Sequence, residues 1–365
     1  MKLNGEIDAI QKCISNRLDL KANPDYRLAG VIGEAPSRYS KSPSLWNAAF
    51  GLLEMKALYV PLDVAQSKLK DLMSAFRNCE RLMGVNVTVP HKLNVVEYLD
   101  ELAPGALRIG AVNTILRTEN GRLTGYNTDG EGFVESILKP QPDQAESFIK
   151  SLDGIDVLLL GAGGSARAVA FHVAPRLNAG RLVICNRTIE YARALGRELR
   201  EAGYHAEAVG EDELARWALN ARLIINTTIK GQGSMGKLSM ERYSALAPAN
   251  THSSEPSKPP EKSSNATGGQ FLESEIEKNH RASFALASRI PMPVGFYDLI
   301  YFPEETVFLR HARETGHRTM NGKAMIVNQA VIAFCDRICH RELAARGLDN
   351  EATKTRVLEA MYSAW

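Results

Sequence analysis

Short apolar runs alternate with amphipathic stretches over the first 140 residues. The runs at 27–33, 57–64 and 83–90 predict buried strands. The stretches 44–55, 68–78 and 91–103 place apolar residues at helical spacing, and so do Ile7, Ile10, Ile14 and Leu18 near the N-terminus. Strands that alternate with helices are typical of a parallel sheet with helical crossovers. We therefore expect a parallel-rich α/β domain over residues 1–140.

A polar stretch at 139–154 predicts a linker, after which a second alternating block begins. The apolar run 155–160 is followed by a Gly-rich turn and a helical pattern over 161–177, and further strands are predicted at 181–188 and 221–228. This strand, turn, helix and strand series is of the dinucleotide-binding (Rossmann) type, so we expect a second α/β domain over residues 150–319.

Three later segments complete the predicted organisation. Residues 249–281 are rich in Ser, Pro, Lys and Glu, which predicts a mobile surface insertion in the second domain. An apolar helix at about 320–345 is expected to rejoin the first domain, and 346–365 reads as a C-terminal helical tail whose docking the pattern does not reveal.

Composition narrows the function classes. The 44 basic and 42 acidic residues are interspersed along the chain, whereas a nucleic-acid binder concentrates its Lys and Arg. No apolar run has the length of a membrane span or of a secretory leader. The five cysteines are scattered and odd in number, which favours a reducing, cytoplasmic compartment over a disulfide framework or a metal site. We expect a monomer or homodimer that acts on a small molecule.

The turn Gly161-Ala162-Gly163-Gly164-Ser165-Ala166 follows the G-x-G-x-x-A pattern between a strand and a helix. Gly161 permits a tight turn, and Gly163 lets a pyrophosphate approach the helix N-terminus. The alternative is a plain glycine loop, which the strand and helix context disfavours.

The end of the next strand indicates which nicotinamide cofactor is bound. An NAD site usually has Asp or Glu there, but this chain has Asn186-Arg187-Thr188. Arg187 can hold a 2′-phosphate with a fork of N–H donors, which favours NADP. The alternative is a surface arginine.

Polar motifs follow the ends of the predicted strands, where open α/β sheets bind ligands. Seven of them occur in the order found in the shikimate dehydrogenase family, which the chain resembles from about residue 26 to 340: S-x-S-P, N-V-T-x-P-x-K, G-A-V-N-T, N-T-D-G, G-A-G-G, N-R-T, and a late Gly with Met and Gln. The resemblance implies two α/β domains with the active site in the cleft between them. It also implies interconversion of shikimate and 3-dehydroshikimate with NADP(H) in aromatic amino acid biosynthesis.

The resemblance also implies roles for individual residues. Lys92 and Asp129 would be the acid-base pair, because oxidation of a hydroxyl requires a group that accepts its proton. Lys92 is expected in the first turn of a helix, and Asp129 could instead cap one. Ser40, Ser42, Thr88, Asn113, Tyr301 and Gln329 would bind the substrate carboxylate and hydroxyls, although such residues are also common in turns. The cofactor would contact Gly161, Ala162, Gly163, Gly164, Ser165, Asn186, Arg187, Thr188, Leu299 and Gly322.

Two other functions remain open at this point. One is a quinate/shikimate dehydrogenase that acts in catabolism, and the other is a non-catalytic ligand sensor, against which the presence of Lys92 and Asp129 argues. Tyr39, where the family commonly has His, and Lys323, where it usually has an apolar residue, depart from the family pattern. So does the segment 225–238, where the family's turn is more apolar.

Overall fold

The structure is a computed structural model that describes all residues except 1, 19, 21–24, 234–241 and 249–267. The chain forms two compact units. Unit 1 comprises Met1–Ser136, Pro140–Glu146 and Ala324–Trp365, and unit 2 comprises Ile137–Lys139 and Ser147–Lys323. The chain first leaves unit 1 within α7 (Asp129–Leu138), returns to it over Pro140–Glu146, and rejoins it at the start of α13 (Lys323–Ala333).

Unit 1 contains a mixed sheet with strand order β2-β1-β3-β5-β6-β4. Its strands are β1 (Arg27–Gly33), β2 (Ala57–Asp63), β3 (Leu82–Val87), β4 (Glu101–Leu102), β5 (Thr114–Arg117) and β6 (Leu123–Tyr126). Its other helices are α1 (Lys2–Gln11), α2 (Pro36–Tyr39), α3 (Ser42–Leu52), α4 (Leu69–Arg77), α5 (His91–Asn94), α6 (Pro104–Ile109), α14 (His340–Ala345) and α15 (Glu351–Ser363). Strands β1, β2 and β3 run parallel, whereas β5 pairs antiparallel with both β3 and β6.

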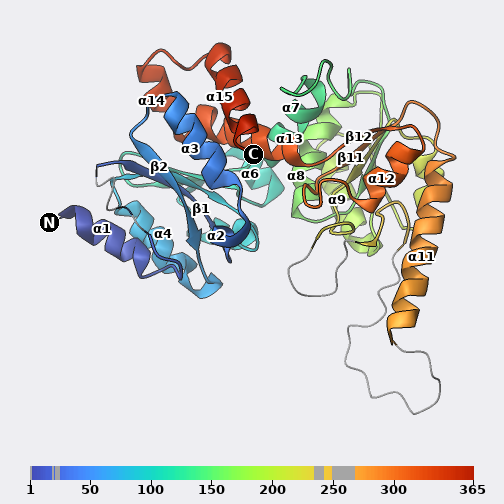
Figure 1. The fold of residues 1–365 in the computed structure, drawn as a ribbon, viewed down its shortest axis with the longest axis horizontal. Coiled ribbons are helices and arrows are strands. Elements are labelled where there is room, and N and C mark those ends of the chain that lie inside the picture. The colour runs from blue at the N-terminus through green and yellow to red at the C-terminus, as the bar shows by residue number, and fades with distance from the viewer. Residues whose placement is uncertain (1, 19, 21–24, 234–241, 249–267) are drawn as a thin grey trace, which may run out of the picture. The chain divides into compact units, whose positions relative to one another are not determined.

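Alternating side chains of β1 divide unit 1 into two cores. Leu28 and Ile32 point to the face covered by α1 and α4. Ala29 and Val31 point to the opposite face, where they pack with α3, α13 and α15. Helix α15 lies beside α3 (Figure 1), and its Val357 and Met361 are fully buried in that core. The C-terminal tail is therefore part of unit 1.

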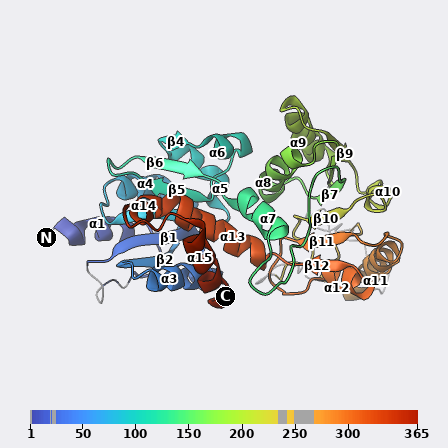
Figure 2. The same cartoon turned by 90° about the horizontal axis from the view of Figure 1, so that it is seen from above.

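Unit 2 contains an all-parallel sheet with strand order β12-β11-β10-β7-β8-β9. The strands are β7 (Val157–Leu160), β8 (Leu182–Cys185), β9 (Ala206–Val209), β10 (Leu223–Asn226), β11 (Gly295–Asp298) and β12 (Arg318–Met320). The helices are α8 (Gly164–Val173), α9 (Ile189–Glu201), α10 (Leu214–Ala218), α11 (Gly268–Ala287) and α12 (Val307–Glu314), and Figure 2 shows them around the sheet. This is the doubly wound order of dinucleotide-binding domains, with its switch point between β7 and β10.

Two expectations from the sequence need correction. The helix expected over 91–103 is only the single turn α5, followed by a 3-10 turn at Val96–Tyr98 and the short strand β4. The first sheet is parallel-rich, as expected, and its antiparallel part arises because five residues, 118–122, join β5 to β6, and so short a connection can only form a hairpin. The expectation of a mobile insertion is wrong for residues 268–281, which belong to α11.

Helix α11 packs on unit 2 through buried apolar residues, Leu286 and Ala287 among them, and through polar contacts of Asn279. Residues 249–267 of the expected insertion lie outside the described residues. Within α11, Ile276 and Asn279 are buried, and the Asn279 amide accepts from Ser244 N at 2.8 Å and donates to the carbonyl of Ala247 at 3.1 Å. These tertiary partners explain the helix, which composition alone disfavours. No helix in the described part of the chain is long and apolar enough to cross a membrane.

Candidate active site

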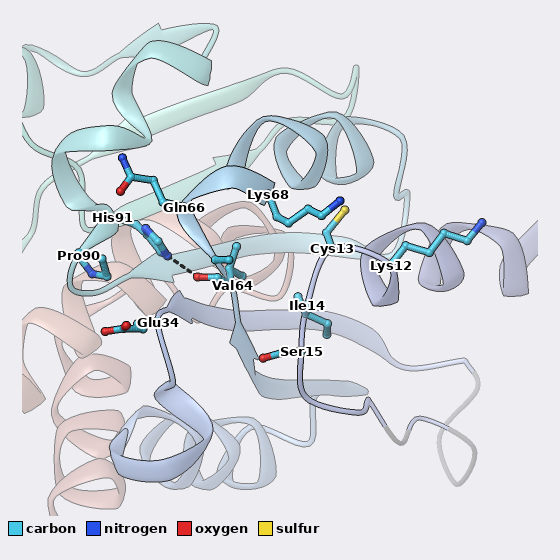
Figure 3. Close-up of a pocket in the computed structure, with 11 residues that line it drawn as sticks. Lys12, Cys13, Ile14, Ser15, Glu34, Val64, Gln66, Lys68, Pro90 and His91 are labelled. Atoms are coloured by element: carbon cyan, nitrogen blue, oxygen red, sulfur yellow. Dashed lines mark hydrogen bonds between the residues drawn. The ribbon is translucent and has the colours of Figure 1, made fainter. Parts of the chain in front are cut away.

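Lys92 is positioned by the short connection from β3 to α5. Its neighbour His91 is buried, and the imidazole Nε2 donates to the carbonyl oxygen of Val64 at 2.7 Å (Figure 3). The carbonyl of Lys92 itself accepts from Val112 N at 2.9 Å. Both contacts fix the backbone of Lys92. Lys92 lies in the first turn of a helix, as expected, but α5 has only four residues, so its dipole contributes little at Lys92.

Lys92 and Asp129 form an ion pair inside unit 1. The Lys92 Nζ lies 2.7 Å from Asp129 Oδ2, and the Lys92 side chain is 29% exposed while that of Asp129 is 8% exposed. Asp129 is the first residue of α7, yet its second oxygen, Oδ1, accepts from Asn113 Nδ2 at 2.8 Å. Its carboxylate oxygens are thus directed at Lys92 and Asn113.

Asn113 links three segments that are distant in the sequence. Besides Asp129, its Nδ2 lies within hydrogen-bond distance of Thr128 Oγ1 (3.0 Å) and Gln329 Oε1 (3.2 Å), and its Oδ1 accepts from Thr128 N at 2.9 Å. Gln329 comes from α13 and is 8% exposed. The structure therefore brings together Lys92, Asn113, Asp129 and Gln329, which the sequence placed in one site.

The two serines lie at the start of α3. Ser40 Oγ accepts from Ser42 N at 3.3 Å, and Ser42 is the first residue of the helix. The Tyr59 hydroxyl, which is fully buried, hydrogen-bonds to Ser42 and donates to Asn86 Oδ1 at 2.7 Å. Burial raises the pKa of Tyr59 well above its usual value. Ser42 is thus connected through Tyr59 to Asn86 on β3.

Sequence reasoning missed several residues of this network. Asn86 Nδ2 donates to Thr114 Oγ1 at 3.0 Å, and Thr114 Oγ1 donates to Asn113 Oδ1 at 2.9 Å. Asn86 lies in the motif N-V-T-x-P-x-K and Thr128 in N-T-D-G, so the sequence could have indicated both residues. The sequence could not indicate a role for Tyr59, because an aromatic residue in a predicted buried strand is expected to be part of the hydrophobic core. Thr88 follows β3, and its methyl group packs against Gly33, where a Cβ would lie 2.5 Å away.

In unit 2 the glycine turn lies between β7 and α8, at the switch point of the sheet. Gly161 has φ of +110°, and a Cβ there would lie 2.5 Å from Thr227 Oγ1, so a side chain would be strained and crowded. Gly163 caps α8, and Gly163, Gly164 and Ser165 are exposed, with open space at both glycine Cβ positions. The exposed N–H groups of this helix end fit a pyrophosphate.

The residues after β8 fit a 2′-phosphorylated cofactor. Asn186 Nδ2 donates to the carbonyl of Thr188, which caps α9, and this contact shapes the turn that carries the exposed Arg187. No acidic residue stands at the strand end, where it would repel a phosphate.

The other residues expected in the site are Leu299 and Tyr301, which follow β11, and Gly322, which packs against Leu299. Leu299 and Tyr301 lie in the segment after β11, so Tyr301 belongs to unit 2, whereas the other expected substrate residues belong to unit 1. A Cβ on Gly322 would lie 2.0 Å from the carbonyl oxygen of Leu299. Glycine is therefore required at 322 for packing against this segment. Among the described residues, no three His, Cys, Asp or Glu side chains gather to hold a metal ion.

Comparison with known proteins decides the family. Residues 31–115 match the shikimate dehydrogenase substrate binding domain, and residues 143–248 match the shikimate / quinate 5-dehydrogenase family. A shikimate dehydrogenase (NADP(+)) from Carboxydothermus hydrogenoformans is 34% identical over 316 residues, which cover 86% of this chain and 92% of that protein. The chain belongs to the shikimate dehydrogenase family.

Solved structures of this family share the fold. The Thermus thermophilus shikimate 5-dehydrogenase in complex with NADP(H) and shikimate has a TM-score of 0.62 and 27% identity, and the match covers 93% of this chain and all of that chain. The Listeria monocytogenes enzyme in complex with shikimate and NAD has a TM-score of 0.65 and 26% identity, with 88% and 93% covered. A 5-ketofructose reductase of Gluconobacter, 23% identical with a TM-score of 0.64, shows the fold alone.

Proposed function

We propose that this chain is an NADP-dependent shikimate dehydrogenase that interconverts shikimate and 3-dehydroshikimate in aromatic amino acid biosynthesis. The observation that carries the proposal is the Lys92 and Asp129 pair, held at 2.7 Å inside unit 1 and hydrogen-bonded through Asn113 to Gln329. The family relatives named for this activity cover most of the chain.

The proposed chemistry is a hydride transfer coupled to a proton transfer. NADP, when bound, would supply the acceptor for the hydride of the ring carbon that carries the reacting hydroxyl. In oxidation, Lys92 would take the hydroxyl proton as the carbonyl forms, and in reduction it would return a proton to the carbonyl oxygen. Asp129 holds the amine in place, while Asn113 fixes the orientation of the Asp129 carboxylate.

Short hydroxyl and amide side chains would recognise the substrate. Ser40 and Ser42 would bind its carboxylate, while Thr88, Asn113, Gln329 and Tyr301 would bind the carboxylate or ring hydroxyls. In unit 2 the Gly161 to Ser165 turn would hold the pyrophosphate, and Asn186, Arg187 and Thr188 the phosphorylated ribose. Leu299 and Gly322 would flank the nicotinamide. The five free, buried cysteines support a cytoplasmic location.

The test is an absorbance assay for NADPH formation in four reactions, with shikimate or quinate and with NADP or NAD. We expect the highest kcat/KM with shikimate and NADP. A chain that binds shikimate but forms no NADPH would be a sensor instead.

Quinate is the specific alternative substrate. It carries an additional hydroxyl on the carbon that bears its carboxylate, where Ser40 and Ser42 would lie. Ser42 is the first residue of α3 and hydrogen-bonds to Tyr59, so its side chain has little freedom to move away from the added hydroxyl. Because a pocket rarely rejects an added hydroxyl completely, we expect about a hundredfold lower kcat/KM with quinate. Comparable values would assign the chain to the dual-substrate branch.

A further inference from the structure

Asp298, the last residue of β11, is a buried carboxyl group with three hydrogen-bond donors around it. Its Oδ1 accepts from Asn226 Nδ2 at 2.9 Å and from the backbone N–H of Ile300 at 3.0 Å. Its Oδ2 accepts from Thr306 Oγ1 at 2.7 Å. Asp298 is fully buried, and in the described part of the chain no cation lies within ion-pair distance of it.

Such a group is costly for the fold. A carboxylate taken out of water without a counter-charge destabilises the native state, and burial raises the pKa of Asp298 to about 7. Residues that destabilise a fold in this way are typical of functional sites.

The hydrogen bonds of Asp298 fix the segment from Leu299 to Tyr301. Leu299 N donates to the carbonyl of Asn226 at 2.9 Å, Ile300 N donates to Asp298, and Ile300 O accepts from Gly322 N at 3.0 Å. Gly322 also packs directly against the Leu299 carbonyl. The Asp298 side chain joins this segment to β10 through Asn226 and to α12 through Thr306.

The same hydrogen bonds reach the cofactor turn. Asn226, the last residue of β10, accepts from Thr228 N at 2.9 Å, and the intervening Thr227 packs against Gly161. Strands β10 and β11 are neighbours in the sheet (Figure 2). Asp298 therefore sets the segment that carries Leu299 and Tyr301 relative to the glycine turn, entirely within unit 2.

We propose that Asp298 is a positioning residue for hydride transfer: through Ile300 and Thr306 it holds Leu299 and Tyr301 in place for the bound nicotinamide ring. This inference rests on the proposed function. Because a displacement of about 1 Å can cost a hundredfold in rate, loss of this anchor acts on kcat rather than on cofactor affinity, which the glycine turn and Arg187 supply.

The test compares Asp298→Ala, which removes all three acceptors, with Asp298→Asn, which keeps Oδ1 for Ile300 and Asn226. The matched control is Asp156→Asn, a carboxylate in the same unit that accepts from Arg181 at 2.6 Å. For each variant, kcat, KM for shikimate and the Kd of NADP are measured. Hydrogen exchange at residues 299–302 is followed by mass spectrometry.

We expect Asp298→Ala to lower kcat by at least about thirtyfold, to change the Kd of NADP less than about threefold and to accelerate exchange at 299–302. Asp298→Asn restores kcat to within about fivefold of the native chain, and Asp156→Asn leaves all values unchanged. The inference is overturned if Asp298→Ala keeps its kcat, if exchange is unchanged, or if Asp298→Asn is as impaired as Asp298→Ala.

A second pair of variants covers the case in which Asp298→Ala does not fold. Thr306→Val removes the hydroxyl that donates to Asp298, and Thr306→Ser retains it. We expect Thr306→Val to lower kcat and Thr306→Ser to restore it, and equal activity of the two would overturn the inference. If the native chain forms no NADPH with shikimate, the proposed function has failed, whereas the exchange measurement still decides whether Asp298 holds the segment.

Discussion

At the scale of single residues, Lys92 is the group on which the proposed chemistry depends most directly. We expect Lys92→Ala to lower kcat by about two to four orders of magnitude, because it removes the proton acceptor. Shikimate binding should change only a fewfold, since other groups contact the substrate. Single-turnover rates and a binding titration measure the two effects. The matched control is Lys68→Ala, a surface lysine of unit 1. A loss of kcat below about tenfold would exclude Lys92 from proton transfer.

Arg187 should determine the choice between the two nicotinamide cofactors. We expect Arg187→Ala to weaken NADP binding by about 1.5–3 kcal/mol and NAD binding far less, because only NADP carries the phosphate. Fluorescence titration with each reduced cofactor gives both Kd values. Arg197→Ala, further along α9 and also exposed, is the control. Equal weakening of both cofactors would mean that Arg187 does not contact the phosphate.

Burial of the Asp298 carboxyl group predicts how the free energy of unfolding depends on pH. Its folded-state pKa of about 7 exceeds the ordinary value, so the folded chain holds this proton more tightly than the unfolded chain does. The stability that protonated Asp298 contributes is present at acid pH and is lost as the pH rises through about 7. Its hydrogen-bond partners Asn226, Ile300 and Thr306 do not titrate in this range.

Urea unfolding of the native chain and of Asp298→Asn at several pH values tests the direction of this pH dependence. Relative to Asp298→Asn, the native chain should lose about 2 kcal/mol of unfolding free energy between about pH 5.5 and 7, and little more above about pH 8. A difference that stays constant across this range would place the folded-state pKa of Asp298 near its ordinary value.

How far the sequence predicts the site depends on whether a residue stands in a motif. Lys92 lies in the turn after β3, Asn113 immediately precedes β5 and Asp129 starts α7, and polar residues are conspicuous at such positions. Tyr59 could not be found in this way, because its hydroxyl gains a role only when α3 and β3 are brought together. Only the fold reveals that Asp298 is buried with neutral hydrogen-bond donors around it.

At the scale of elements, long periodic segments were predictable and short ones were not. Strands β1, β2 and β3 and helix α4 correspond to uninterrupted patterns in the sequence. The hairpin of β5 and β6 was missed because these two short strands mix apolar with polar residues, and they are stabilised by their neighbours rather than by an apolar run of their own. Helix α11 was missed for the same reason, since its packing depends on contacts made far away in the chain.

Helix α11 gives a prediction at this scale. Asn279→Ala should lower the unfolding free energy by about 1–3 kcal/mol, because it leaves the buried N–H of Ser244 without its acceptor and removes a donor from the carbonyl of Ala247. Glu277→Ala, an exposed position on the same helix, is the control and should be nearly neutral. Thermal and urea unfolding measure both. Equal stability of the two variants would show that the hydrogen bonds of Asn279 do not stabilise unit 2.

For the whole molecule, the two units differ in how the chain builds them. Unit 2 is nearly continuous, whereas one core of unit 1 takes about half of its residues from the C-terminal segment. Trp46, fully buried, has its ring 5.2 Å from that of Phe334. We expect a fragment of residues 147–323 to fold alone, and a fragment of residues 1–146 to remain unfolded or to aggregate.

Circular dichroism and tryptophan fluorescence distinguish the two outcomes. Trp46 is the only tryptophan before residue 146, so its emission in the short fragment should be that of a solvent-exposed indole. Addition of a peptide covering residues 324–364, which omits Trp365, should shift the emission of Trp46 to shorter wavelength. A blue-shifted emission from the short fragment by itself would show that unit 1 does not need its C-terminal segment.

The contact between Asn113 and Gln329 has a consequence for synthesis on the ribosome. The lysine and aspartate of the proposed acid-base pair are translated early, but the amide that completes their surroundings lies 216 residues after Asn113. At about 5–20 residues per second, that interval lasts on the order of tens of seconds. During this time the nascent second unit can fold behind an unfinished first unit. The part of the polypeptide that is made first is therefore the part that becomes active last.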